Sequence, residues 1–259
     1  GNAVDAAVAT AFALAVTHPP AGNIGGGGFL LFKSARGEAT AYDFREIAPA
    51  SAYDRMFLHD GQQYDPALHH HSHRSVGVPG TVAGLHLVWR ERGRLPWARL
   101  LEPAIRLAHD GFVVSDGLAN SLRQHWTKLS SRPASRAQFS IRGEPCSAGA
   151  VLRQPDLART LRRIARYGPD DFYRGHIAAL IEQEMARHGG LITGADLAAY
   201  VAKRREPLRS RYRSCEVLSM PPPTSGGAIL ILMLNVLEQY DLGAMEPGNA
   251  QTVHVMAET

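Results

Sequence analysis

The stretch Ile24–Phe32 reads IGGGGFLLF, four consecutive glycines followed by four bulky apolar residues. Before it, residues 3–17 place apolar side chains at helical spacing, with Ala and Val filling nearly every gap, which predicts a helix buried on most sides. After it, residues 29–32 predict a short apolar strand, and residues 39–44 predict the returning strand of a hairpin. The order helix, glycines, hairpin indicates an α+β fold in which helices pack on an antiparallel sheet.

The glycine run does not have the context of a phosphate-binding loop. Such a loop of the P-loop type ends in Gly-Lys-Ser/Thr, whereas Gly28 is followed by Phe29 and the next lysine is Lys33. A dinucleotide-binding loop has a strand before its glycines and a helix after them, which is the reverse of the order here. We therefore expect a structural role, in which the backbone passes where a Cβ atom would clash or adopts a positive φ.

Further helices and strands are predicted along the rest of the chain. The polar, histidine-rich residues 59–74 and the aperiodic residues 127–150 predict surface loops. Apolar periodicity, Pro at first helical turns, a capping box and Gly at helix ends predict the ordered elements. These are helices at 82–92, 97–110, from Pro155 onward, around 177–185 and from Thr193, a strand at 216–220, and a second buried helix at 228–238.

Composition and charge exclude several classes of protein. The 259 residues carry a formal net charge of +4, but the arginines are dispersed among Asp and Glu, which is typical of a solvated surface and not of a nucleic-acid-binding face. Cys146 and Cys215 lie in neither a C-x-x-C nor a zinc spacing, so we expect two thiols without a bridge. The most apolar runs are too short to span a bilayer.

Two candidate site residues follow the predicted hairpin, Arg45 and Glu46 in Asp43-Phe44-Arg45-Glu46. An arginine at the end of a strand can bind a carboxylate with two parallel hydrogen bonds, but spacing alone favours an ordinary surface pair of Arg45 with Glu46. The histidines of 69–73 predict a solvated loop more than a metal site, since adjacent side chains point in different directions. No G-x-S-x-G element is present, so the residues by themselves give no complete catalytic set.

Nine stretches in a fixed order nevertheless resemble one family. They are GNAVDAAVATAFAL, NIGGGGFLLF, YDFREIAPA, VGVPGTVAGL, LLEPAIRLAHDGF, QPDLARTLRRIA, DFYRGHIAALI, GGLITGADLAAY and MPPPTSGG. Together they resemble the large-subunit part of the gamma-glutamyltranspeptidases across nearly the whole chain. The resemblance implies that residues 1–259 form a single domain, a fragment of the large subunit of a self-processing precursor whose small subunit is absent here. It also implies the αββα sandwich of an N-terminal-nucleophile hydrolase.

The resemblance further implies an activity. In this family the new N-terminal Thr of the small subunit attacks a gamma-glutamyl amide, commonly that of glutathione, and no metal or organic cofactor takes part. The matching position makes Arg45 the expected ligand of the substrate α-carboxylate, and we expect Glu46 to orient Arg45 or the local backbone. No catalytic residue is expected before Thr259, so this chain alone is expected to be inactive.

The resemblance also sets the expected partners and the alternatives. The expected partners are the protein's own small subunit and a gamma-glutamyl small molecule, without nucleic acid or metal, in the periplasm or outside the cell. Alternatives are an acylase of the same fold that acts on a cephalosporin side chain or on poly-gamma-glutamate, and a non-catalytic homologue that serves as a binding module.

Overall fold

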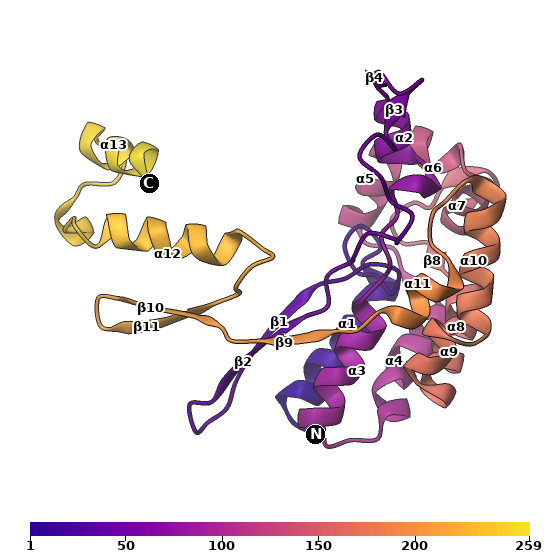
Figure 1. Ribbon diagram of the computed structural model, residues 1–259, viewed down its shortest axis with the longest axis horizontal. Helices are drawn as coiled ribbons and strands as arrows, with labels where there is room; N and C mark the ends of the chain where they lie inside the picture. The colour runs from indigo at the N-terminus through magenta and orange to yellow at the C-terminus, as the bar shows by residue number, and fades with distance from the viewer. The chain divides into compact units, whose positions relative to one another are not determined.

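The computed structural model describes residues 1–259, which form two compact units (Figure 1). The helical unit comprises residues 1–28 and 44–202, and the sheet unit comprises residues 29–43 and 203–259. The chain therefore leaves the helical unit after Gly28, returns at Phe44, and leaves it again after Ala202.

The helical unit is built around helix α1 (Ala3–Thr17), as the sequence predicts. This helix packs on α4 (Trp97–Asp110) and α3 (Thr81–Arg92), and α4 packs in turn on α8 (Pro155–Tyr167). The rings of Phe12 and Trp97 meet edge to face, with their centroids 5.5 Å apart. The unit is completed by α9 (Pro169–Tyr173), α10 (His176–His188) and α11 (Gly194–Ala199).

A buried carboxylate ties the start of α1 to the turn between α3 and α4. Asp5 accepts hydrogen bonds from the backbone N–H groups of Asn2 (2.8 Å), Arg94 (2.9 Å) and Leu95 (3.2 Å), and the Asn2 side chain caps α1 in return. Burial by itself raises the pKa of the Asp5 carboxyl, but these N–H donors outweigh it and hold that pKa below its ordinary value. Asp5 therefore stays charged and holds two distant parts of the chain together.

Two segments that the sequence predicted as loops contain regular structure. Residues 58–75 form the hairpin β3 (Leu58–His59) and β4 (Gln63–Tyr64), then α2 (Pro66–His71) and a 3₁₀ turn, η1 (His73–Ser75). The loop prediction was wrong here because it relied on apolar periodicity, which this segment lacks. Helix α2 is instead favoured by Pro66 in its first turn and by the Asp65 side chain, which accepts hydrogen bonds from two backbone N–H groups.

The second wrong loop prediction concerns residues 127–150. They contain α6 (Trp126–Ser130), α7 (Pro133–Phe139) and the short strands β6 (Ser140–Ile141) and β7 (Glu144–Pro145). This region joins α5 (Asp116–Gln124), β5 (Phe112–Val113) and β8 (Val151–Leu152) around a small core that includes Leu122 and Cys146. Residues 127–150 are held in place by contacts with parts of the chain that are distant in the sequence. The periodicity of a single sequence gives no information about such contacts.

The sheet unit confirms the predicted hairpin. Strand β2 (Ala39–Asp43) lies between β1 (Phe29–Lys33) and β9 (Lys203–Arg205), all antiparallel, with Phe29 and Lys203 both opposite Asp43. The Asp43 carboxylate accepts a hydrogen bond from Arg205 Nε at 2.7 Å. A second hairpin, β10 (Leu208–Tyr212) and β11 (Cys215–Ser219), precedes α12 (Gly226–Leu237), the 3₁₀ turn η2 (Leu242–Ala244) and α13 (Ala250–Glu258).

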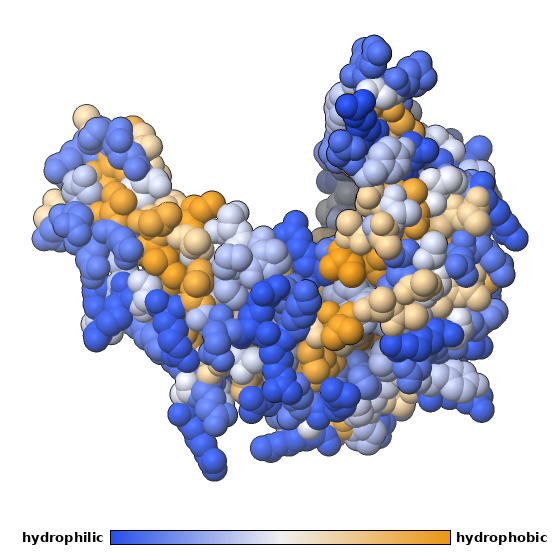
Figure 2. All heavy atoms as spheres, viewed as in Figure 1, coloured by the Kyte–Doolittle hydropathy of each residue, from blue (hydrophilic) through white to orange (hydrophobic).

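Helix α12 is present as predicted, but the prediction that it is buried was wrong for this chain. Only Gly227 is buried in it, and Leu232 is 63% exposed. The hairpin β10–β11 packs on α12, and Figure 2 shows hydrophobic residues along α12 and α13 at the surface. No helix of the chain is long and apolar enough to span a membrane.

Candidate substrate-binding site

The segment Phe44–Ile47 holds the two predicted site residues, Arg45 and Glu46, with both side chains exposed. Its backbone is paired at both ends. Phe44 and Gly28 exchange two hydrogen bonds (3.0 and 3.2 Å), and Ile47 and Val78 exchange two more (2.8 and 3.3 Å). The guanidinium of Arg45 therefore projects from a backbone that is fixed on either side of it.

The glycine run makes this arrangement possible. A Cβ atom on Gly27 would lie 2.5 Å from the carbonyl oxygen of Phe44 and 2.7 Å from the backbone nitrogen of Glu46, and one on Gly28 would lie 2.9 Å from the Phe44 ring. The predicted close approach is confirmed, and the partner of these two glycines is the Arg45 segment itself. No glycine from Gly25 to Gly28 has a positive φ, so the requirement is one of space and not of conformation.

The glycines are also bonded to the start of α3. The carbonyl oxygen of Gly26 accepts from the backbone N–H groups of Gly80 (2.7 Å) and Thr81 (3.0 Å). The Asn23 side-chain oxygen accepts from the Gly26 N–H (2.8 Å) and from the Thr81 hydroxyl (3.0 Å). The glycine run, the start of α3 and the Arg45 segment are thus one hydrogen-bonded assembly.

Two tyrosines, Tyr200 and Tyr173, add hydrogen bonds to this assembly. The Tyr200 hydroxyl donates to the carbonyl oxygen of Arg45 at 2.8 Å. The Tyr173 hydroxyl donates to the carbonyl oxygen of Pro79 at 2.8 Å and accepts from the Ala83 N–H at 3.2 Å. Both tyrosines lie in stretches that carry the family resemblance, DFYRGHIAALI and GGLITGADLAAY. Sequence reasoning still missed their role, because each bonds a segment far away in the chain.

The geometry suits recognition of an anion. A guanidinium can offer two parallel N–H donors to a carboxylate, and an anchored backbone lowers the entropy lost when it does so. The Glu46 side chain lies against the glycines instead: its Oε2 is 2.8 Å from the Cβ position of Gly27, and its Cβ is 3.0 Å from that of Gly77. The Glu46 side chain thus lies close to the backbone of two glycines.

The histidines of residues 69–73 are engaged in local contacts. The Tyr64 hydroxyl bonds His69 Nδ1 (2.7 Å) and His70 Nε2 (3.2 Å), and His73 lies 3.3 Å from a carboxylate oxygen of Glu184. No group of three or more His, Cys, Asp or Glu side chains is arranged to hold a metal ion. Cys146 and Cys215 are both free thiols, as the sequence predicts.

Comparison with known proteins identifies the class. The model of the gamma-glutamyltranspeptidase family matches residues 1–259, and the chain belongs to that family. It is 49% identical over 259 residues to the glutathione hydrolase proenzyme of Escherichia coli K12, and 39% identical over 264 residues to the Acylase ACY 1 proenzyme of Pseudomonas sp. SE83. Both matches cover 100% of this chain, but only 45% and 47% of the relatives' own lengths.

The fold agrees with the family. The crystal structure of Helicobacter pylori gamma-glutamyltranspeptidase superposes with a TM-score of 0.96 at 43% identity, covering 99% of this chain and 74% of that one. The α+β fold is therefore that of the large-subunit portion of an N-terminal-nucleophile hydrolase, as the resemblance predicted.

Proposed function

We propose that the complete protein hydrolyses or transfers gamma-glutamyl groups, with glutathione as a natural donor. The observation that carries the proposal is the exposed guanidinium of Arg45 on a backbone paired at Phe44 and at Ile47. The 49% identity to a glutathione hydrolase proenzyme along the whole chain supports the same assignment. Arg45 binds the α-carboxylate of the glutamyl group, and Glu46 packs on the glycines and keeps the Arg45 backbone in place.

The chemical step uses groups outside these 259 residues. The hydroxyl of an N-terminal Thr attacks the gamma-carbonyl carbon, the amide C–N bond breaks, and the amine leaves with a proton. Water or an amino acid then takes the acyl group from the threonine. This chain contributes the anchoring of the donor, and no metal or organic cofactor is needed.

We also propose that residues 1–259 belong to one domain of a large subunit, and that its partner is the small subunit made from the same precursor. The name proenzyme in the relatives supports processing, and the chain spans about 45% of their length. We further propose a periplasmic or extracellular location, as the family resemblance implies.

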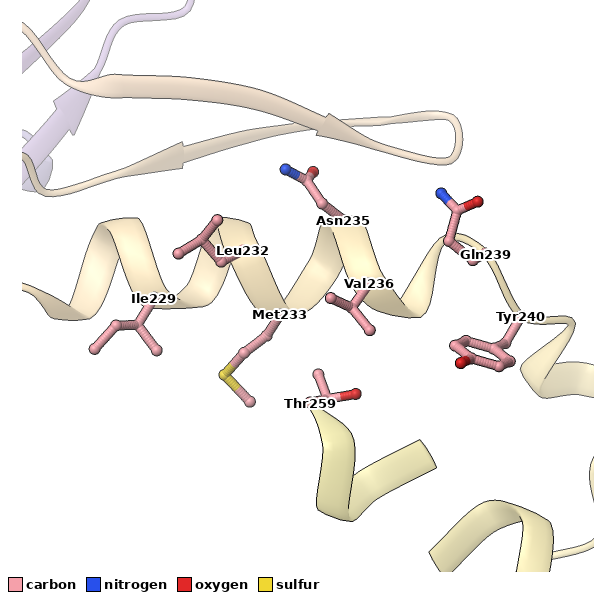
Figure 3. A pocket seen from close by; sticks show the side chains of 8 residues that line it. All are labelled: Ile229, Leu232, Met233, Asn235, Val236, Gln239, Tyr240 and Thr259. Carbon is pink, nitrogen blue, oxygen red and sulfur yellow. The ribbon is translucent and has the colours of Figure 1, made fainter. Parts of the chain in front are cut away.

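The apolar face of α12 is the surface that we assign to the remainder of the precursor. A groove there is lined by Ile229, Leu232, Met233, Asn235, Val236, Gln239, Tyr240 and Thr259 (Figure 3). In the complete precursor, Leu232→Glu should lower the yield of assembled protein, because a charge would be buried. Val113→Glu is the matched control, since Val113 is 65% exposed on β5 in the helical unit. Equal assembly of the two variants would rule out this surface.

The complete protein tests the proposed function directly. Release of the chromophore from a gamma-glutamyl anilide is followed beside a denaturing gel. Activity with two bands supports a self-processed gamma-glutamyl enzyme, whereas one uncut and inactive band supports the binding-module alternative. The 259-residue chain by itself should release no chromophore.

An acylase with another acyl group is the second candidate, because a relative named as an acylase is 39% identical along the whole chain. Arg45 does not discriminate between the two, since those acyl groups also carry a carboxylate. Two bands without gamma-glutamyl activity, together with hydrolysis of a cephalosporin side chain or of poly-gamma-glutamate, would move the assignment to this candidate.

A further inference from the structure

Tyr200, which bonds the backbone of Arg45, has a role that the proposed function does not include. We propose that Tyr200 is a positioning residue, whose hydroxyl fixes the carbonyl group of Arg45 and thereby the point from which the guanidinium reaches the substrate. The inference rests on the proposed function in one respect, namely that Arg45 binds the donor's α-carboxylate.

The hydroxyl of Tyr200 is directed at this backbone group. Its side chain is buried, and its hydroxyl donates to the Arg45 carbonyl oxygen at 2.8 Å across 155 positions of sequence. A Cβ atom on Gly80 would lie 2.1 Å from both the Tyr200 hydroxyl and the Phe44 carbonyl oxygen. The missing side chain at Gly80 is therefore what lets the hydroxyl reach the Arg45 segment.

Tyr173 holds Tyr200 in place. The two rings are stacked, with centroids 5.6 Å apart and planes 12° from parallel. Burial raises the pKa of the Tyr173 phenol, so it remains protonated at neutral pH and keeps its bonds to Pro79 and Ala83 at the start of α3. One rigid aromatic pair therefore connects the start of α3 with the backbone of Arg45.

Hydrogen bonds that do not involve Tyr200 hold the backbone before and after Arg45. The amide and carbonyl groups of Phe44 pair with Gly28, and those of Ile47 pair with Val78. The Arg45 carbonyl lies between those pairs, and the tyrosine bonds it. Removal of the hydroxyl takes one hydrogen bond from the Arg45 carbonyl group, and the flanking pairs should then open more often.

Tyr200→Phe in the complete protein tests the proposal, because it keeps the ring and removes only the donor. We expect KM for a gamma-glutamyl anilide to rise by roughly three- to tenfold, the worth of one net hydrogen bond, with kcat nearly unchanged. Trp97→Phe is the control. It also removes a buried donor to a backbone carbonyl, that of Ile164 at 3.0 Å, and should leave KM unchanged. Equal KM in Tyr200→Phe and the wild type would overturn the proposal.

A double variant shows whether Tyr200 acts through Arg45. If it does, adding Tyr200→Phe to Arg45→Ala raises KM no further, because the side chain that it positions is gone. A further rise of the same size as in the wild-type background would mean that Tyr200 acts independently of Arg45, and would overturn the proposal.

Hydrogen exchange gives a readout that does not depend on activity. The amides of Phe44 and Ile47 should exchange faster in Tyr200→Phe than in wild type or in Trp97→Phe. Unchanged exchange would overturn the positioning role whatever the kinetics. If the wild type released no chromophore but exchange still increased, the proposed function would fail and the effect on the Arg45 segment would stand.

Discussion

A side chain at Gly84, near the start of α3, should destabilise the protein, although alanine is the better helix former. A Cβ atom there would lie 2.1 Å from Cγ of Phe44 and 2.3 Å from both its Cβ and its Cδ1. Relaxed carbon–carbon contacts are about 3.5–4.0 Å. Phe44 is itself buried and its backbone is paired with Gly28, so the ring cannot move aside without moving the residue next to Arg45.

Two opposing effects set the size of the change. Replacing Gly by Ala inside a helix gains about 0.5–1 kcal/mol. Overpacking of a core costs about 1–3 kcal/mol. Since the collision is with the root of a buried side chain and not with its flexible end, we take the upper part of that range, and Gly84→Ala should destabilise by about 1–2 kcal/mol. That corresponds to a Tm lower by roughly 2–8 °C for a unit of this size.

Thermal unfolding of the complete protein checks this value, with Gly117→Ala as the control. Gly117 lies in α5, and the nearest atom to its Cβ position is the Ser115 hydroxyl oxygen at 3.9 Å, so the control should leave Tm unchanged or raise it. Gly84→Ala should also raise KM for the gamma-glutamyl donor. A Tm for Gly84→Ala equal to or above that of wild type would refute the packing argument.

Three other predictions concern the helical unit and the thiols. Asp171 accepts two hydrogen bonds from Arg163 (2.7 and 2.8 Å), which hold the pKa of the carboxyl below its ordinary value of 3.8. The charged Asp171 therefore contributes its full stabilisation above pH 3.8, and this contribution is lost as the pH falls below that value. The Tm of Asp171→Asn should be lower than that of wild type at pH 7, and the difference should shrink below about pH 4. Asp5→Ala leaves buried N–H donors unpaired and should cost about 2 kcal/mol in urea unfolding, and a loss below half of that would contradict the role given to Asp5. A thiol reagent followed by mass spectrometry should modify exposed Cys215 well before buried Cys146, whose thiol pKa is raised by burial, and equal rates would contradict this arrangement.

The sequence predicts local features well where chemistry within a few residues decides them. The helix at residues 3–17, the capping box at Thr193 and the hairpin after the glycines are all confirmed. The prediction failed where distant contacts decide. The predicted burial of α12 was wrong for this chain. An apolar composition indicates that a helix packs against something, but it does not show that residues 1–259 provide the packing surface.

The candidate site was only partly accessible from the sequence. Spacing alone favoured a surface pair for Arg45, and the family resemblance, not local chemistry, made it a candidate. Tyr200 could not have been predicted, because its partner lies 155 positions away and nothing in its local motif marks a binding residue. The glycine run predicted a close approach of the backbone, but only the structure identifies the Arg45 segment as the partner of Gly27 and Gly28.

The most direct test of the central claim compares two donors in the complete protein. One is a gamma-glutamyl anilide, and the other is the 4-aminobutyryl anilide, which lacks the α-carboxylate. Wild-type protein and an Arg162→Ala control, which removes another exposed arginine on α8, should prefer the first donor strongly in kcat/KM. In Arg45→Ala this preference should fall by about 10- to 100-fold, the worth of hydrogen bonds to a charged group. An Arg45→Ala variant that keeps the full preference would contradict the assignment of Arg45 to the α-carboxylate.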